Sequence, residues 1–421
     1  MEFAKTPIGA GQSLVVPVPA FEPSSANPGT LHVTGKAEFA DGGKGWDSVK
    51  TRLFAEKVVD VEQLTGPPVM TRALVTKKLC FRYPGSFGAD QGEDYFEEGV
   101  PTIRPARGLK VTMDLGQGTH EYYLDRDGCS SQVFLAGPTV AHVHTHGSIE
   151  SAYFDVVDVA EGSEVQSFTF SFNLTSSTST QTVDFDPSAS DAADAFNVAQ
   201  AAAWTLRRVW EGELASVTIR VNDPTPQSGY LNEVVKLEVG DHDNKWTIAH
   251  ELGHWVMDQL TDAPETSSCG ASHGRASIED QRCALSEGFG NNVAATAFNL
   301  TGLSNCSYAG IDCDQGLTTG GNCTSKSLLW TQVMESCAPS QAPWSGLGNE
   351  TDWSRVLWNM RSPATGLGTT QLTDWIRTAN DSVAWTDTNV YTLLNNRANA
   401  IGGTLNSLFD THKVVHGIDH P

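Results

Sequence analysis

The spacing of hydrophobic residues changes near residue 185, and this change constrains the fold more than any other feature of the sequence. Before it, apolar and polar residues alternate along 109–113, 140–144 and 165–172, as they do in strands with one buried face. After it, an Ala-rich segment at 192–209 has apolar spacings of three and four, which predicts a helix. We therefore expect an α+β fold, in which an antiparallel β-sandwich precedes a mainly helical region with a small β-sheet.

The length of the chain, 421 residues, exceeds what one hydrophobic core usually serves, so we expect two domains. Residues 1–30 are rich in Pro, Ala and Ser and indicate an extended leader. Residues 31–185 form the predicted β-sandwich, an accessory domain that is either a prosegment or a binding module. Residues 186–421 form the second domain, which also contains predicted strands at 217–221 and 233–239.

The charge of the chain limits its partners. Fifty acidic and 27 basic residues give a formal net charge of −23, which repels phosphate backbones and anionic membrane surfaces. No apolar stretch approaches the ~18 residues that a membrane span requires. We therefore expect neither a nucleic acid nor a membrane as a partner.

The eight cysteines form no C-x-x-C pair of the kind found in zinc knuckles and redox sites. An even number, spread through Gly- and Asn-rich segments, is typical of disulfides in an oxidising compartment. The sequence therefore predicts a secreted protein, extracellular or periplasmic. Eight cysteines allow ~105 connectivities. Sequence order favours the pairs Cys80–Cys129, Cys269–Cys283, Cys306–Cys313 and Cys323–Cys337.

The strongest chemical signal is the motif H-E-x-x-H, which occurs as His250-Glu251-Leu252-Gly253-His254. On a helix, residues four apart lie on one face, so both imidazoles can bind a single metal ion. Glu251 is rotated by about 100° from His250, so it can address a water at the metal instead of the metal itself. Two histidines require at least one further ligand.

Glu287 is the candidate third ligand. It lies in the segment 284–292, where Gly288 and Gly290 permit close packing against the first helix. Glu279 and Asp280 are alternative carboxylates. Two histidines and one carboxylate leave a fourth position open for water, which is the arrangement of catalytic rather than structural zinc.

The motif, followed downstream by Glu287-Gly288-Phe289-Gly290-Asn291, resembles the gluzincin metallopeptidases, which include thermolysin-like and aminopeptidase-like enzymes. The resemblance implies a Zn²⁺ ion held by His250, His254 and Glu287. It also implies that Glu251 is the general base in the hydrolysis of peptide bonds, and that the partner is a peptide or protein substrate.

The chain departs from thermolysin-like enzymes at two points. The spacing from His254 to Glu287 is longer than in thermolysin, and Asn291 stands where these enzymes carry an aspartate that orients the first histidine. An asparagine can still accept a hydrogen bond from an imidazole N–H, although it brings no charge. Gluzincins also present an edge strand to an extended substrate, and the strand predicted at 234–239 is in position for this role.

A second resemblance concerns the predicted sandwich. The segments 104–111 and 124–129 are similar to transthyretin-like β-sandwich repeats of secreted bacterial proteins. The resemblance covers a small part of the chain. It implies an accessory or binding module that contributes no catalytic residues.

A peptidase of this kind also needs a hydrogen-bond donor opposite the metal to stabilise the oxyanion. Four residues of the second domain are candidates: Tyr308, Tyr391, His412 and His416. Arg355 is a candidate for binding a substrate carboxylate. No motif marks any of these residues, and an ordinary surface or packing role is the alternative for each.

Two further clusters contain residue types that bind metals. His142, His144 and His146 alternate along a predicted strand and therefore face one side, which favours an exposed polar face over a second metal site. The segment 241–244 (Asp-His-Asp-Asn) lacks the spaced carboxylates of a calcium loop. An acidic cap at the N-terminus of the following helix is the better interpretation.

Together these features predict a secreted zinc-dependent metallopeptidase. A secreted adhesin or binding protein with a structural or vestigial zinc site is one alternative. A zinc hydrolase of a non-peptide amide or ester is another. Glu251 argues against the first alternative, because a site without turnover has no use for a general base.

Overall fold

The structure of the protein, a computed structural model, describes residues 75–84, 103–114, 119–135, 139–160, 162–163, 165–170, 179–187, 193–212, 214–261, 269, 279–298, 346–361, 367–381, 384–415 and 417–419. In chain order, the elements are β1 (Val75–Pro84), β2 (Ile103–Pro105), β3 (Leu109–Asp114), β4 (Thr119–Tyr123), β5 (Cys129–Leu135), β6 (Thr139–Ile149), β7 (Ala152–Asp158), β8 (Gly162–Ser163), β9 (Val165–Phe170), β10 (Thr180–Asp184), α1 (Ala193–Val209), β11 (Ala215–Asp223), β12 (Gly229–Leu231), β13 (Val234–Glu238), η3 (Asp241–Asp243), α2 (Lys245–Thr261), α3 (Gln281–Phe298), η4 (Gly346–Gly348), α5 (Glu350–Arg361), α6 (Thr369–Asn380), α7 (Val390–Ile401) and α8 (Gly403–Val415). All of them lie in one compact unit, Arg72–Pro421. The combination of helices with mixed sheets confirms the predicted α+β class.

Most of the described strands belong to one nine-stranded sheet. They run in the order β12-β13-β11-β7-β6-β3-β4, with β8 paired to β7 and β9 paired to β6. A smaller sheet of four strands has the order β10-β1-β2, with β5 also paired to β1. Buried side chains of both sheets belong to one hydrophobic cluster, so the two sheets share a core.

The large sheet continues across residue 185. β7 pairs in parallel with β11, from Ala152 opposite Ala215 to Asp158 opposite Val221. Strands from both sides of the expected boundary are therefore hydrogen-bonded within one sheet. The division into two domains at residue 185 stays a prediction.

Among themselves, the described strands that precede residue 185 pair antiparallel, as predicted, with one exception. β1 pairs in parallel with β10, Lys78–Arg82 against Thr180–Asp184. The prediction of a purely antiparallel sandwich is wrong at this pair, because the alternation of apolar residues identifies a strand but not its direction. The strands predicted at 109–113, 140–144 and 165–172 are observed as β3, β6 and β9, except that residues 171–172 lie outside the described residues.

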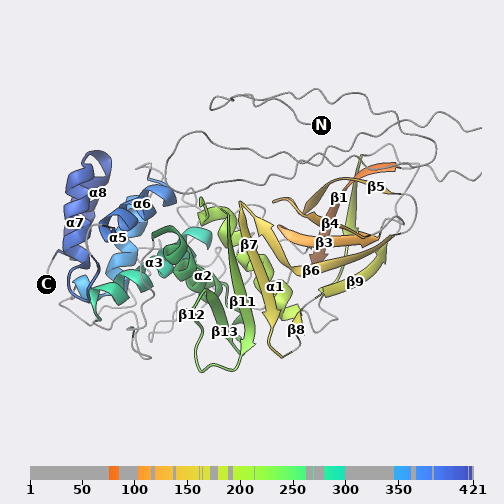
Figure 1. Cartoon of the computed structure of the whole chain (residues 1–421), viewed down its shortest axis with the longest axis horizontal. Helices are drawn as coiled ribbons and strands as arrows, with labels where there is room; N and C mark the ends of the chain where they lie inside the picture. The colour runs from red at the N-terminus through yellow and green to blue at the C-terminus, as the bar shows by residue number, and fades with distance from the viewer. Residues whose placement is uncertain are drawn as a thin grey trace, which may run out of the picture. The chain divides into compact units, whose positions relative to one another are not determined.

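Helix α1 lies across the large sheet, against β6 and β7 (Figure 1). Small side chains allow this close approach, since Ala195, Ala199 and Ala202 are fully buried. Ala is also the best helix former. The helix predicted at 192–209 is observed at Ala193–Val209.

Glycines set the distance between α2, α3 and α5. A Cβ on Gly253 of α2 would lie 2.7 Å from the Cα of Gly290 on α3. A Cβ on Gly290 would lie 3.0 Å from ring atoms of His250. On the other side of α3, a Cβ on Gly288 would lie 2.6 Å from the Cβ of Trp353 in α5. Larger side chains at these positions would push the helices apart.

Replacing Gly253 with Ala should therefore lower the free energy of unfolding, although Ala favours a helix by about 1 kcal/mol over Gly. The added methyl group meets the backbone of Gly290, which has no side chain to move aside, and such overpacking costs ~1–3 kcal/mol. Chemical denaturation followed by circular dichroism measures the change. The control is Gly229→Ala, because nothing lies within 4 Å of a Cβ there. A Gly253→Ala protein as stable as the parent would contradict the close packing of the two helices.

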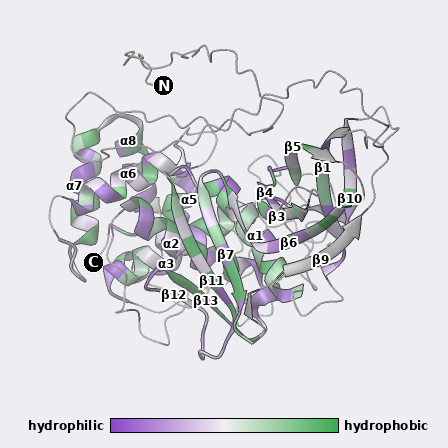
Figure 2. Cartoon of the chain, turned by 45° about the vertical axis from the view of Figure 1, so that its right-hand side comes forward, coloured by the Kyte–Doolittle hydropathy of each residue, from purple (hydrophilic) through white to green (hydrophobic). Residues whose placement is uncertain are grey.

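The C-terminal helices pack through apolar side chains. Figure 2 shows hydrophobic and hydrophilic residues interspersed on α7 and α8. In α6, Leu372, Trp375 and Ile376 are buried, and the ring of Trp375 lies 4.9 Å from that of Phe409 in α8, centroid to centroid. None of the helices in the described ranges is long and apolar enough to cross a membrane.

Two disulfides join described residues. Cys80 of β1 is bonded to Cys129 of β5, and Cys269 is bonded to Cys283 of α3. Both pairings agree with the prediction from sequence order and confirm it. The other two predicted pairs, Cys306–Cys313 and Cys323–Cys337, lie outside the described residues.

Candidate metal centre

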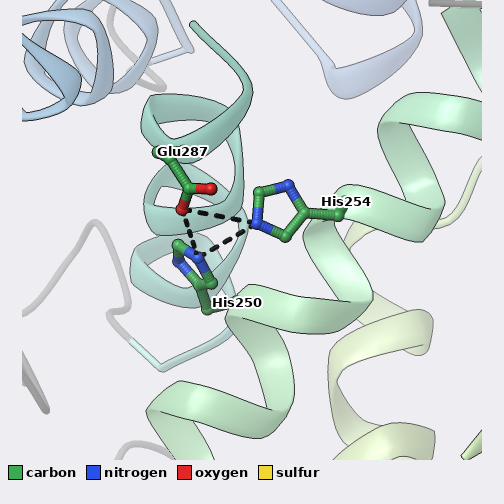
Figure 3. Close-up of side chains that lie close together, drawn as sticks. All are labelled: His250, His254 and Glu287. Atoms are coloured by element: carbon green, nitrogen blue, oxygen red, sulfur yellow. Dashed lines mark hydrogen bonds and ion pairs between the residues drawn. The ribbon is translucent and has the colours of Figure 1, made fainter. Parts of the chain in front are cut away.

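Helix α2 positions both histidines of the motif. It begins after Asn244, whose Oδ1 accepts a backbone N–H of the first turn at 3.2 Å. The segment 241–244 therefore supplies a helix cap, but through an amide and not through the acidic side chain that was expected. The rotation of the helix about its axis is fixed by five buried apolar side chains: Ile248, Ala249, Leu252, Trp255 and Val256. His250 and His254, one turn apart, consequently point toward α3 (Figure 3).

His250, His254 and Glu287 bring their ligand atoms together (Figure 3). Nε2 of His250 lies 2.9 Å from Oε2 of Glu287, and Nε2 of His254 lies 3.5 Å from the same oxygen. The two Nε2 atoms are 3.1 Å apart. Two imidazole nitrogens and one carboxylate oxygen are the donor set that binds zinc with one position left open. The residues present therefore fit a zinc ion.

The remaining imidazole nitrogens contact side chains of α3. Nδ1 of His250 lies 3.1 Å from Oδ1 of Asn291, and Nδ1 of His254 lies 3.0 Å from Oγ of Ser286. Asn291 also accepts a hydrogen bond from Nε1 of Trp246 at 3.3 Å. With a metal bound at the Nε2 atoms, Nδ1–H of His250 would donate to Asn291 and Nδ1–H of His254 to Ser286, which would hold both rings in orientation. The contact of Asn291 with the first histidine agrees with the expectation from the sequence, whereas no motif marks Ser286.

Charges around the centre shift the pKa of His250 and of Glu287. Burial alone would lower the pKa of His250, but the hydrogen bond to Glu287 and three nearby carboxylates raise it to about 9. These carboxylates belong to Glu287, Glu251 and Glu350. Burial would raise the pKa of Glu287, but the charge of His254 and hydrogen bonds from both histidines hold it well below its usual value. Glu287 is therefore ionised, and metal binding would displace a proton from His250.

Glu251 is buried beside the centre, with 7% of its surface exposed. Its charge acts on the pKa of His250, yet it does not belong to the group of three ligand atoms. This is the relation expected of a base that addresses a water. Glu350, the first residue of α5, acts on the same histidine and is 5% exposed. No sequence pattern marks Glu350, because its position depends on how α5 packs against α3.

The two alternative carboxylates have other partners. Asp280 precedes α3, and its Oδ1 accepts the backbone N–H of Cys283 at 2.9 Å, which is a helix-cap contact. A carboxylate oxygen of Glu279 contacts the sulfur of Cys283. Among described residues, neither carboxylate forms a metal-compatible group with the two histidines. The geometry favours Glu287 as the third ligand.

The structure describes two of the four candidate oxyanion donors. Tyr391 lies on α7, its ring 6.3 Å from that of Phe409 between centroids, and burial raises its pKa. His412 lies on α8, where burial lowers its pKa. Tyr308 and His416 lie outside the described residues. The role of a donor stays a prediction for all four.

Arg355 lies on the buried side of α5 and is 8% exposed. Its Nη1 is 3.4 Å from Oδ1 of Asp352, one turn earlier. Burial raises the pKa of Asp352 to about 7, although the charge of Arg355 opposes the shift. A role for Arg355 in binding a substrate carboxylate stays a prediction.

His142, His144 and His146 lie on one face of β6, since each is partly exposed between buried neighbours. Nε2 of His144 lies 3.0 Å from Oγ1 of Thr112, and burial, together with the charge of His146, lowers the pKa of His144 to about 4. In the part of the chain that the structure describes, the three histidines belong to no metal-compatible group. The polar-face interpretation therefore fits better than a second metal site.

The strand expected at the sheet edge is observed as β13, but it does not form the edge. β12 pairs with it on one side and β11 on the other. A tight turn at Asn232 and Glu233, both with positive φ (52° and 63°), folds β12 back onto β13. The expectation that a substrate pairs with 234–239 is therefore wrong where β12 covers this strand. The short strand Gly229–Leu231 forms one edge of the described nine-stranded sheet.

Replacing Asn291 with Ala should weaken zinc binding by about 10–100-fold, because His250 loses the partner of its Nδ1. Asn291→Asp should keep the affinity, since a carboxylate accepts the same hydrogen bond. Asn292→Ala is the control, because it also removes a buried polar side chain from α3. Competition with a chromophoric chelator measures all three affinities. Equal affinities for Asn291→Ala and Asn292→Ala would contradict the orienting role of Asn291.

Comparison with known proteins finds a related family for part of the chain. No curated protein matches the chain. The family model of the mycolysin C-terminal domain matches residues 197–306, a range that contains α2 and α3. This is a domain of secreted, zinc-dependent metallopeptidases. Around its candidate metal centre, the chain is therefore similar to a domain of secreted zinc metallopeptidases.

Proposed function

We propose that the protein is a secreted zinc metallopeptidase of the gluzincin type, which hydrolyses peptide bonds. The observation that carries the proposal is the convergence of Nε2 of His250, Nε2 of His254 and an oxygen of Glu287 within 4.8 Å of one another. The match of the surrounding segment to the mycolysin C-terminal domain supports it. Two disulfides support secretion.

In the proposed reaction, His250, His254 and Glu287 would hold the zinc ion. The chemistry that zinc would supply there is that of a Lewis acid, which polarises a carbonyl and lowers the pKa of a water. Glu251 takes a proton from the attacking water and then delivers it to the departing amine. The side chains that contact the Nδ1 atoms keep both imidazole rings oriented.

Cleavage profiling of a denatured peptide library tests this function. We expect cleavage by the zinc-loaded protein, loss of cleavage in a zinc chelator, and recovery when zinc is restored. His254→Ala is the negative control, since it removes one ligand and leaves Glu251 in place. Cleavage at the parent rate in the chelator or by this variant would contradict the proposal. Zinc binding without any peptide cleavage would favour a non-peptide amide or ester as the substrate.

A further inference from the structure

The Cys269–Cys283 disulfide lies beside Glu287, the third residue of the candidate metal centre. Its two sulfur atoms and a carboxylate oxygen of Glu287 all lie within 4.8 Å of one another. Cys283 precedes Glu287 by four residues on α3, so the two side chains lie on one face of the helix. Cys283 is fully buried, and Glu287 has 5% of its surface exposed. The disulfide is therefore a buried neighbour of the carboxylate.

The disulfide adjoins the carboxylate and not the imidazoles. Among the described residues, its sulfur atoms form no metal-compatible group with His250 or His254. We therefore expect any effect of the disulfide on a metal to pass through Glu287. Oε2 of Glu287 lies 2.9 Å from Nε2 of His250 and 3.5 Å from Nε2 of His254. A disulfide sulfur carries no proton, so it donates no hydrogen bond that would compete with the imidazoles or a metal for this carboxylate.

The disulfide also ties the connection between the two ligand helices to α3. Cys269 lies between the end of α2 at Thr261 and the start of α3 at Gln281. Its bond to Cys283 joins this connection to α3 one turn before Glu287. Both sulfur atoms thereby stay beside the carboxylate. The disulfide forms an apolar wall on one side of Glu287, whereas the two histidines lie on α2.

We propose that the Cys269–Cys283 disulfide is a positioning group for the metal centre, which holds the carboxylate of Glu287 at the two histidines and keeps water from it. The inference rests on the proposed function, because it requires a zinc ion at the three converging residues. Apolar groups around a metal site control the access of water and the local dielectric. Without the disulfide, a cavity beside Glu287 would admit water, and the carboxylate would turn toward it. Zinc affinity should therefore depend on this disulfide.

Replacing both Cys269 and Cys283 with Ala should weaken zinc binding by about 10–100-fold, the usual effect of losing a group that orients a ligand. Ala leaves no thiol that binds zinc by itself. Competition with a chromophoric chelator measures the affinity, and circular dichroism checks that the variant is folded. If it does not fold, Cys269→Ala/Cys283→Val takes its place with the same expectation, because Val fills more of the buried position.

The matched control is Cys80→Ala/Cys129→Ala, which removes the disulfide between β1 and β5. Its cysteines are separated by 49 residues along the chain, against 14 for Cys269 and Cys283. A longer closed loop means a larger loss of stability when the bond is removed. The control should nevertheless bind zinc like the parent. An equal loss of zinc affinity in both double variants would indicate a general effect of lower stability and would overturn the inference.

A positioning role also predicts that the effect disappears when Glu287 is absent. In Glu287→Ala, removal of the Cys269–Cys283 disulfide should change zinc affinity by less than about twofold, because no carboxylate is left to hold. In Asn291→Ala, the same removal should cost the full factor. Asn291 contacts His250 and not Glu287, and independent effects add. A chelator of lower affinity extends the competition to these weaker sites.

Cobalt(II) in place of zinc gives a spectroscopic readout of the same change. Its visible absorption is strong when four ligands surround the ion in a tetrahedron and weak when there are six. We expect weaker absorption in cobalt-loaded Cys269→Ala/Cys283→Ala than in the parent, because water replaces the carboxylate. Cys80→Ala/Cys129→Ala should have the spectrum of the parent. Identical spectra of all three proteins would contradict the displacement of Glu287.

Two affinity results would overturn the inference. One is equal zinc affinity of the parent and Cys269→Ala/Cys283→Ala. The other is a loss of the same size when the disulfide is removed from Glu287→Ala, which would show that the disulfide does not act through this carboxylate. Both leave the proposed function intact if the parent binds zinc. A parent protein that binds neither zinc nor cobalt would overturn the proposed function together with the inference.

Discussion

Replacing Glu251 with Gln should leave zinc bound and lower peptide turnover by about 10²–10⁴-fold, the usual effect of losing a general base. Gln keeps the shape and the hydrogen-bonding capacity of the side chain but cannot take the proton of the attacking water. Because Glu251 does not belong to the group of ligand atoms, the metal content should not change. Steady-state kinetics on a peptide substrate and elemental analysis of the same sample measure the two quantities.

The matched control for this variant is Glu350→Gln. Glu350 and Glu251 are similarly buried, at 5% and 7% exposed, and both charges act on the pKa of His250. A large loss confined to Glu251→Gln would assign proton transfer to Glu251. Equal losses would indicate a shared electrostatic effect instead. Turnover by Glu251→Gln within about tenfold of the parent would contradict its role as the base.

Replacing Glu287 with Ala should weaken zinc binding by more than the ~10–100-fold that loss of an outer partner causes. The change removes the anionic ligand and leaves two neutral imidazoles, which neutralise the charge of Zn²⁺ poorly. Glu279→Ala and Asp280→Ala are the controls. Glu279 contacts the sulfur of Cys283 and Asp280 accepts its backbone N–H, and neither carboxylate forms a metal-compatible group with the two histidines among the described residues. Both controls should retain zinc. Competition with a chromophoric chelator, without reductant so that the Cys269–Cys283 disulfide stays intact, ranks the affinities.

The opposite ranking would contradict the gluzincin assignment. If Glu287→Ala bound zinc like the parent while Glu279→Ala or Asp280→Ala lost it, the third ligand would be the other carboxylate. Circular dichroism of each variant excludes unfolding as the cause. Asn291→Ala should fall between Glu287→Ala and the controls, since Asn291 contacts a ligand and not the metal.

Sequence patterns predicted those parts of the fold that depend on short-range periodicity. The Ala-rich spacing at 192–209 predicted α1, and the alternation along 140–144 predicted the two faces of β6. Strand direction and strand order were not predictable in this way. The parallel pairing of β1 with β10 joins segments about a hundred residues apart. The burial of β13 inside the sheet depends on a turn at Asn232 and Glu233 that no Gly marks.

The same distinction holds for the candidate site. Helix geometry alone predicted that His250 and His254 share a face. Glu287 was identified as the third ligand because the residues around it resemble the corresponding segment of gluzincins. Ser286 and Glu350 were not predictable. Their positions depend on how α3 packs against α2 and α5, which the contacts of three glycines determine. These glycines are Gly253, Gly288 and Gly290.

The metal content of the dialysed protein tests the central claim most directly. Protein produced in zinc-replete medium and dialysed against metal-free buffer should contain one zinc ion per chain by elemental analysis. His250→Ala and His254→Ala, prepared in parallel, should contain far less, because each loses one of the three converging ligands. A parent protein that contains almost no zinc and takes up none on titration would contradict the metal centre at His250, His254 and Glu287.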